Sequence, residues 1–314
     1  MRPLDYKLIH ALDTVLTEQS FESAALALNI TQSAISQRIK QLEQLVAKPV
    51  LIRSQPLQAT TTGQKLLAHF RKVRQLEYDL AGDIMPDSAP SSIPISIAVN
   101  ADTLASWFIE ALTPLLKTQP IELNIQVTNE VDTQKLLKKG EVLAAISSQK
   151  QSFSGVKVEY IGTLDYILCA NQDYINKYFK GGLTIENLNK APCIDYDQRD
   201  KMHSDYLKKH FAIEQAIYPC HRIRSSEVVV TMALAGLAYA LIPTTQADEH
   251  LASGALINLA PDKHLKMPLY WHSWALERGV QKLITKTIGD YGRSHFNQCE
   301  KYLDANRKTI NSNQ

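Results

Sequence analysis

The stretch Asn29–Leu45, NITQSAISQRIKQLEQL, combines two helical faces of opposite character. Apolar residues recur at Ile35, Ile39 and Leu42, and steps of three and four place them on one side of a helix. An acid on the opposite face would be repelled by phosphate, whereas short hydroxyls and amides can approach base edges closely. The sequence puts hydroxyls, amides and one lysine there, at Ser33, Gln37, Lys40 and Gln44.

Two shorter apolar patterns precede this helix. The apolar residues between Leu8 and Leu16 have helical spacing and predict a first helix of about four turns. SFESAALAL follows, with Ser20 as candidate N-cap and Asn29, which tolerates left-handed backbone, where the second helix should end. Thr31 can then cap the third helix. The three helices together predict a helix-turn-helix unit whose third helix enters the groove of double-stranded DNA.

Basic residues accumulate in the same region. Between Thr31 and Arg74 the chain carries eight Lys or Arg residues and one acid, Glu43, while the whole chain has a net charge of only +2. Phosphate contacts require such a local excess, although a solvated face also produces charge runs. The predicted DNA contacts are Thr31, Gln32, Ser33, Ser36, Gln37, Arg38, Lys40, Arg53 and Thr60.

The next segment, VLIRSQPLQATTTGQ, is β-rich at its ends and has a polar tip, which predicts a two-stranded wing. Arg53 could reach the DNA backbone or minor groove from this wing, or be an ordinary surface arginine. Apolar residues from Leu66 to Ile84 then predict a long helix with one continuous seam. Packing on the winged domain explains part of this seam, and dimerisation would explain the rest. The expected units are a DNA-binding domain, 1–62, and a linker helix with hinge, 63–94.

The segment Pro86–Pro94, PDSAPSSIP, marks the domain boundary because its three prolines exclude regular structure. Beyond it, β and α patterns alternate and then restart at DYILCA, which predicts parallel sheets covered by helices in two similar lobes. The fold class is therefore α/β multidomain, with an effector-binding region, 95–314. Lobe I spans about 95–160 with 269–314, and lobe II about 164–268.

Ligands in open α/β sheets bind beyond the carboxyl ends of strands, where two lobes can form a cleft. Asn100 ends the strand ISIAV, Ser147 ends VLAAIS, and Ser226 begins a helix after CHRIR. Each of these polar groups could instead be a helix cap without a ligand.

FESAALALNITQSAISQRIKQLE, with the wing and long helix behind it, resembles the LysR-type transcriptional regulators. AVNADTLASW, GEVLAAIS, LDYILCA, PCHRIRSSE, LASGALINL and LYWH further resemble a branch that responds to lysine and arginine and controls basic amino acid export. The resemblance covers essentially the whole chain. It implies a winged helix-turn-helix joined to a two-lobed, periplasmic-binding-protein-like effector domain, promoter DNA and RNA polymerase as partners, and a homodimer or homotetramer. Some members of that branch were also described as inhibitors of replication initiation through origin binding, which is one alternative function. The other is a LysR-type regulator that senses another small molecule, or peroxide through Cys193 and Cys220.

The same resemblance implies an effector site for lysine or arginine. A basic amino acid needs donors for its carboxylate and acids for its amines. Within DYDQRDKMH, Lys201 departs from the branch, which has a second acidic position there. The implied effector residues are Asn100, Asp102, Thr103, Glu130, Ser147, Asp197, Asp200, Ser226 and Glu227.

Other functions find less support in the sequence. His203, His210 and His221 suggest catalysis, but no GxSxG, HExxH, Walker loop or GxGxxG accompanies them. Cys193 and Cys220 could form a peroxide sensor, but their apolar, strand-like settings favour inert thiols. A metal site at Cys220 and His221 is disfavoured because neighbours on a strand point to opposite faces. We expect no metal or cofactor, and no enzymatic activity.

The chain's location is also an expectation from composition. No apolar run approaches the roughly 20 residues that a membrane helix needs, and no secretory signal is recognisable. The four cysteines form no CxxC pair, which is typical of reduced thiols. We therefore expect a cytoplasmic protein without a membrane partner.

Overall fold

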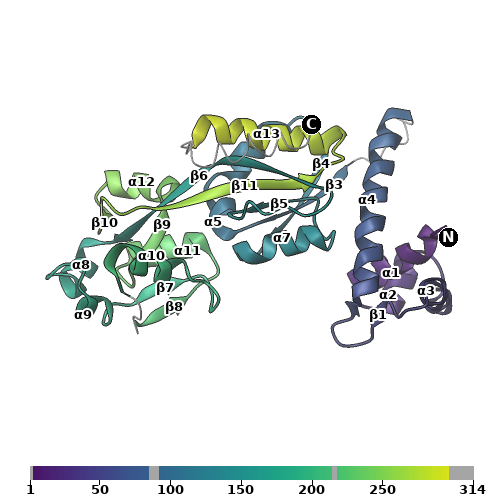
Figure 1. Cartoon of the computed structure of the whole chain (residues 1–314), viewed down its shortest axis with the longest axis horizontal. Helices are drawn as coiled ribbons and strands as arrows, with labels where there is room; N and C mark the ends of the chain where they lie inside the picture. The colour runs from purple at the N-terminus through teal and green to yellow at the C-terminus, as the bar shows by residue number, and fades with distance from the viewer. Residues whose placement is uncertain (1–2, 85–91, 214–217, 297–314) are drawn as a thin grey trace.

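The computed structural model describes residues 3–84, 92–213 and 218–296, apart from the side chains of residues 79, 82, 83, 130 and 131. Figure 1 shows a helical domain carrying the N-terminus, the long helix α4 that leaves it, and an α/β region beyond. The N-terminal helices are α1 (Tyr6–Glu18), α2 (Phe21–Ala27), α3 (Gln32–Val46) and α4 (Thr61–Ile84).

The helix boundaries in the N-terminal domain follow from local capping. Ser20 and Thr31 are extended residues whose hydroxyls accept the backbone N–H groups of Ser23 and Ala34, which would otherwise lack partners. Asn29 has φ 51°, so the chain turns between α2 and α3 as the sequence predicts. The buried apolar faces of α1 and α3 meet in one core, with Leu12, Ile35 and Ile39 inside.

The wing is a short antiparallel pair, β1 (Leu51–Ile52) and β2 (Gln58–Ala59). Gln19 fastens it to α1, since its side chain accepts the Leu57 N–H at 2.7 Å and donates to the Leu57 carbonyl at 3.2 Å. Glu43, the acid of the basic stretch, accepts the Val50 N–H at 3.0 Å. That carboxylate therefore has a structural partner at the end of α3.

The effector region contains one seven-stranded sheet, in the order β10-β6-β11-β5-β3-β4, with β9 also paired to β6. Its strands are β3 (Ile93–Val99), β4 (Ile121–Val127), β5 (Ala144–Ser147), β6 (Val156–Ala170), β9 (Ala240–Pro243), β10 (Ile257–Asn258) and β11 (Leu265–Trp274). A separate parallel pair consists of β7 (Cys193–Asp195) and β8 (Cys220–Arg222).

The expected purely parallel arrangement is wrong for this sheet. β3 pairs in parallel with β4 and β5, but β11 is antiparallel to both β5 and β6. The physical reason is the length of β6 and β11, which run from one lobe into the other in opposite directions (Figure 1). The expected division near residues 160–164 falls inside β6, so the two lobes share one sheet.

Helices cover both lobes. Those of lobe I are α5 (Ala101–Thr103), the π-helical turn Leu104–Phe108, α6 (Ile109–Leu116), α7 (Glu130–Lys138) and α13 (Gly279–His295). Those of lobe II are α8 (Gln172–Tyr178), α9 (Ile185–Leu188), α10 (Met202–Phe211), α11 (Ser226–Leu234) and α12 (Thr244–Ala252). α13 packs on α6 and β6, so this helix lies on lobe I.

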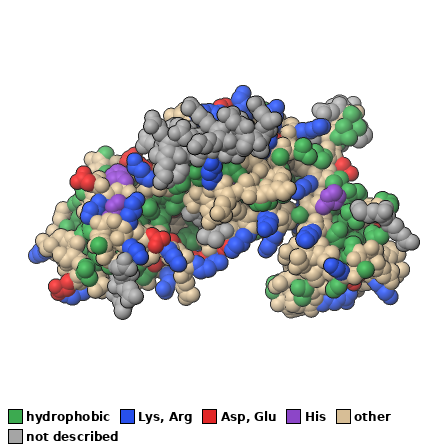
Figure 2. Space-filling model, in the orientation of Figure 1, with side chains coloured by type: hydrophobic (Ala, Val, Ile, Leu, Met, Phe, Trp, Pro, Cys, Tyr) green, Lys and Arg blue, Asp and Glu red, His purple; other side chains and the backbone are tan. Residues whose placement is uncertain are grey.

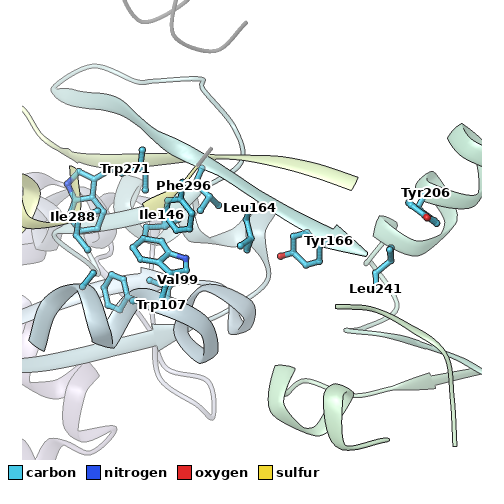
Figure 3. Close-up of a cluster of buried hydrophobic side chains, with 14 of the residues drawn as sticks. Val99, Trp107, Ile146, Leu164, Tyr166, Tyr206, Leu241, Trp271, Ile288 and Phe296 are labelled. Atoms are coloured by element: carbon cyan, nitrogen blue, oxygen red, sulfur yellow. The ribbon is translucent and has the colours of Figure 1, made fainter. Parts of the chain in front are cut away.

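One core runs through both lobes. Figure 3 shows Trp107, Trp271 and Ile288 packed in lobe I, Tyr206 and Leu241 in lobe II, and Tyr166 between the two groups. The buried Trp271 indole N–H donates to the Thr285 hydroxyl at 2.8 Å, which offsets the cost of burying it. Among the described helices none is both long and apolar enough to cross a bilayer.

Helix α4 also contacts the effector region. The Lys72 ammonium lies 3.3 Å from the centroid of the Trp274 ring. Arg71 donates to the Gly140 carbonyl at 3.3 Å and pairs with Asp13 at 2.8 Å. A Cβ on Gly140, whose φ is +68°, would lie 2.5 Å from the Ala68 Cα, so only glycine permits this close approach.

Candidate DNA-binding surface and effector cleft

The exposed side of α3 is the candidate DNA-binding surface. Ile35, Ile39 and Leu42 are buried, which turns the polar side outward. The predicted contacts Thr31, Gln32, Ser33, Ser36, Gln37 and Lys40 are all exposed, and Arg38 is half-buried at the edge. Among the charged side chains on the visible face of this domain, basic ones are more frequent than acidic ones (Figure 2). The arrangement can present amides, hydroxyls and one ammonium together to a DNA groove.

The two predicted contacts outside α3 differ in availability. Arg53 is exposed on the wing, with its guanidinium 5.2 Å from the centroid of the Phe21 ring. The Thr60 hydroxyl donates to the Pro49 carbonyl at 2.8 Å and accepts the Gly63 N–H at 3.1 Å, at the start of α4. Thr60 thus has a capping role, which the sequence analysis did not consider.

Part of the basic stretch does not face the DNA-binding surface. Arg71 pairs with Asp13, Lys72 lies over Trp274, and Arg74 donates to the Tyr78 hydroxyl at 3.0 Å. These three bases therefore join α4 to α1, to the effector region and to its own next turn. The charge count alone overestimated the number of bases available for phosphate.

A cavity of about 660 Å³ lies between the lobes and is the candidate effector cleft. Figure 2 shows acidic and basic side chains together at the hollow between these lobes. Four of the predicted residues line it, namely Asn100, Asp102, Asp200 and Ser226. Asn100 caps α5, and its side-chain oxygen accepts the Thr103 N–H at 3.1 Å. The wall also has apolar parts, including Met202, Ile223, Val229, Leu265 and Met267.

Asp102 connects the lobes at the cleft. One carboxylate oxygen, Oδ2, accepts a hydrogen bond from the Tyr166 hydroxyl at 2.8 Å. The other oxygen, Oδ1, lies 2.6 Å from the hydroxyl of Ser226 on lobe II. Ser226 is in turn 2.7 Å from Gln246 Oε1. Burial raises the pKa of Asp102, although the two hydroxyl donors act in the opposite direction. This carboxylate is therefore a partly desolvated acceptor on the cleft wall.

Of the remaining predicted effector residues, the four whose side chains are described do not line the cleft. Thr103 is fully buried, and the hydroxyl of the buried Ser147 lies 3.1 Å from the Gln149 N–H. Glu227 is exposed and accepts the Ser225 hydroxyl at 2.8 Å. Asp197 is buried behind the wall, where the Arg199 backbone N–H and two guanidinium groups lower its pKa. The side chain of Glu130 lies outside the described residues.

Several charged residues of the cleft wall were missed. Asp195 and Asp205 add acids to Asp102 and Asp200, while the bases are Lys135, Arg199 and Lys201. The segment DYDQRDKMH contains Asp195, Arg199 and Lys201. Its high density of charged residues was the feature of the sequence that could have indicated them as cleft residues. Lys135 lies on α7, and no local pattern places that helix opposite this segment.

A second polar bridge joins the lobes. Arg199 of lobe II lies 3.0 Å from Asp132 of lobe I, and the same guanidinium is 3.8 Å from Asp197. Arg224 also approaches Asp197, at 3.2 Å. A hydrogen bond from Lys135 and the Arg199 charge lower the pKa of Asp132. Asp102, Ser226 and Arg199 line the cleft, so an ion bound there would compete with or reinforce these bridges.

The histidines do not form a catalytic group. His203 is buried, with Nε2 2.9 Å from the Tyr239 hydroxyl, and burial lowers its pKa to about 4. His221 is exposed on β8, and the His210 ring on α10 is tilted against the Tyr206 ring, with their centroids 4.8 Å apart. Burial also raises the pKa of the thiols Cys169 and Cys193, to about 12 for Cys169, and thiols in that state are poor nucleophiles.

Comparisons with known families match both parts of the chain. Residues 6–64 match the bacterial regulatory helix-turn-helix protein, lysR family. Residues 89–285 match the LysR substrate binding domain. The chain belongs to the LysR family of transcriptional regulators. This membership confirms the predicted fold class, a helix-turn-helix domain followed by a LysR effector domain, and the function of a DNA-binding regulator rather than an enzyme.

Within the LysR family the chain falls in the branch of the ArgP regulators. It is 53% identical over 293 residues to the HTH-type transcriptional regulator ArgP of Aeromonas salmonicida, covering 93% of this chain and 98% of that protein. ArgP from Mycobacterium tuberculosis has a similar structure, with TM-score 0.83 and 29% identity over 95% of this chain and 100% of that one. Full-length LysG from Corynebacterium glutamicum, with bound effector Arg, matches with TM-score 0.74 and 26% identity over 94% of this chain and 100% of that one.

Proposed function

We propose that this LysR-type regulator senses arginine or lysine in the cleft between its lobes and thereby controls transcription from promoter DNA. The observation that carries the proposal is the set of four carboxylates on the cleft wall, at Asp102, Asp195, Asp200 and Asp205. Three bases accompany them, so the wall offers partners for two cationic groups and one carboxylate. The bound effector Arg of the similar LysG structure supports the same ligand class.

The apolar part of the wall supports a long aliphatic ligand. Met202, Val229 and Met267 can contact methylene groups while the charged ends reach the acids and bases. Lys201 is exposed at the cleft and adds a positive charge among the acids. We expect this charge to pair with the ligand carboxylate, leaving the acids for the amines.

Ligand binding would be transmitted through the bridges between the lobes. Asp102 with Ser226, and Asp132 with Arg199, are the contacts that an amino acid in the cleft would rearrange. A change in lobe closure would alter how effector domains pack in an oligomer and so the spacing of the DNA-binding domains. RNA polymerase contact at the promoter would respond to that spacing. A coupling free energy of about 1–3 kcal/mol is sufficient.

An oligomer is favoured by the exposed stripe on α4. Leu76, Leu80 and Ile84 are spaced four residues apart and are 40%, 54% and 62% exposed. We propose that this stripe packs against a second copy in a homodimer or homotetramer, placing two α3 helices on half-sites of one duplex. Sedimentation of the full chain and of Leu80→Asp tests this, and an unchanged mass for the variant would contradict it.

Calorimetry on the full chain tests the ligand. We expect arginine or lysine to bind, while citrulline and norleucine, which resemble them but lack the side-chain cation, should bind at least about tenfold more weakly. DNase footprinting of the DNA upstream of the neighbouring genes, with and without the bound ligand, then tests the regulatory response. Equal binding of norleucine and lysine would contradict the role of the cleft acids.

A further inference from the structure

The parallel pair β7 and β8 brings together two cysteines that are 27 positions apart in the chain. Cys193 and Cys220 are direct register partners. Asp195 lies two residues along β7, and side chains two residues apart on a strand share a face. The two sulfur atoms and a carboxylate oxygen of Asp195 all lie within 4.8 Å of one another.

The three donor atoms are close enough to share one ion. Cys220 Sγ is 3.1 Å from Asp195 Oδ2. Tetrahedral zinc, with Zn–S of about 2.3 Å and Zn–O of about 2.0 Å, places its donors roughly 3.5–3.8 Å apart. Small rotations of these side chains would bring all three donors into that geometry. The backbone ladder of β7 and β8 already holds their Cα positions.

The surroundings of the cluster also favour an ion. Cys193 is fully buried, and Asp195 Oδ1 is a buried oxygen without a hydrogen-bond partner in the described part of the chain. A buried acceptor without a donor is costly, and a cation would satisfy it. Tyr218, which stacks edge-on against His203, closes one side, and burial raises its pKa.

We propose that Cys193, Cys220 and Asp195 form a binding site for a thiophilic divalent cation such as Zn²⁺. Two thiolates and one carboxylate suit zinc, cobalt and cadmium and disfavour magnesium and calcium, which prefer oxygen ligands alone. Asp195 also lines the effector cleft. The metal site and the effector cleft share Asp195, but neither sulfur atom belongs to a residue of the cleft wall, so sulfur ligation can be measured separately from amino acid binding.

Binding of the ion displaces the two thiol protons. Burial raises the pKa of Cys220 to about 11 and also raises that of Cys193, so both are thiols before the ion arrives. Each sulfur then forms one bond to the metal and releases one proton to solvent. No oxidant is required. The protein is kept reduced with a phosphine in the test, which prevents a Cys193–Cys220 disulfide from removing the ligands.

Cobalt provides a direct readout of sulfur ligation. The full chain, reduced and stripped of metal, is titrated with Co²⁺ alone, and thiolate-to-cobalt charge-transfer bands are expected to saturate at one equivalent per chain. Added Zn²⁺ should abolish the bands by displacement. Cys220→Ser should remove the charge-transfer bands and weaken Zn²⁺ at least about 100-fold, and Asp195→Asn should weaken it about tenfold.

Cys169→Ser is the matched control. Cys169 is also fully buried in lobe II but lies outside the cluster, so its replacement should leave the cobalt spectrum unchanged. All variants are made with Cys299 replaced by serine, because Cys299 lies outside the described residues. Cys220 is half-exposed, so Cys220→Ser is expected to fold even if Cys193→Ser does not, and circular dichroism checks this. Absence of the bands in the reduced parent chain, or their retention in folded Cys220→Ser, would overturn the proposal.

Discussion

The DNA-binding domain and the effector cleft are built in different ways. The polar face of α3 comes from ten consecutive positions, 31–40, and the N-cap Thr31 fixes where the helix begins. The cleft wall draws on residues from Asn100 to Met267, carried by several helices, strands and loops of both lobes. A function carried by one helix is therefore visible as a pattern, whereas one assembled from distant elements is not.

The two regions differ in how their polar side chains are engaged. The side chains of Ser33 and Gln37 are exposed to solvent, and the Ser33 hydroxyl contacts the neighbouring hydroxyl of Thr31. Asp102, Ser226 and Asp132 contact charged or hydroxyl groups of the other lobe or of the shared sheet. Substitutions on α3 should change affinity for DNA without changing stability, while substitutions at the cleft should change both.

The largest effect is expected on α3. Ser33→Glu with Gln37→Glu adds two acids to the proposed DNA-binding surface and removes two proposed groove contacts, so DNA affinity should fall at least about 100-fold, or about 3 kcal/mol. Mobility-shift titration at fixed salt measures it. Gln172→Glu, on the exposed side of α8, is the charge control and should lose almost nothing. Undiminished duplex binding by the folded double variant would remove the basis for assigning this face.

Asp102→Asn tests the assembled site. Its neutral amide cannot balance a cationic ligand and mispairs with the Tyr166 and Ser226 hydroxyls, so arginine affinity should fall about 30-fold, or about 2 kcal/mol. Calorimetry measures this. Asp173→Asn, exposed on α8 and away from the cleft wall, is the control. If both variants bound arginine as the parent does, Asp102 would have no part in recognition.

The buried His203 makes lobe II sensitive to acid. Its ordinary pKa of 6.5 is lowered to about 4 by burial, so the unfolded chain takes up a proton that the folded chain does not. The contribution of the neutral His203 to the free energy of unfolding is thus fully present above pH 6.5 and is lost as the pH falls toward 4. Between pH 7 and pH 5 this loss should reach about 2 kcal/mol. Urea unfolding of the parent and of His203→Gln should give this difference in pH dependence. The exposed His221→Gln should retain the parent's slope.

The smallest effect is expected where the two regions meet. Lys72→Met keeps the aliphatic stem but removes the cation over Trp274, and should cost about 1 kcal/mol of unfolding free energy in the full chain. Lys65→Met, exposed on the same helix, is the control. Tryptophan fluorescence should change only in the first variant. Equal denaturation midpoints for the two variants would indicate that α4 moves freely relative to the effector region.

The sequence predicted some elements closely and others not at all. β4 was expected as IELNIQV and occupies Ile121–Val127, because an apolar pattern bounded by Pro120 and Thr128 leaves little choice. The proposed metal site shows the opposite case. Cys220 was considered with its neighbour His221, which points away, while its actual neighbours Cys193 and Asp195 are supplied by β7. Sequence distance gave no indication of that pairing.

The amino-acid sequence by itself determined the three helices, their caps, the acid-free face of α3 and the resemblance to a family, because each depends on residues within one or two helical turns. Only the tertiary structure decided that β6 and β11 join the lobes in one sheet, and that Asp102 meets Ser226. It also decided that the Lys72 side chain, which belongs to the basic stretch, lies over the Trp274 ring. These outcomes depend on strand pairing and burial between distant segments, whose free energies are not encoded in any local pattern.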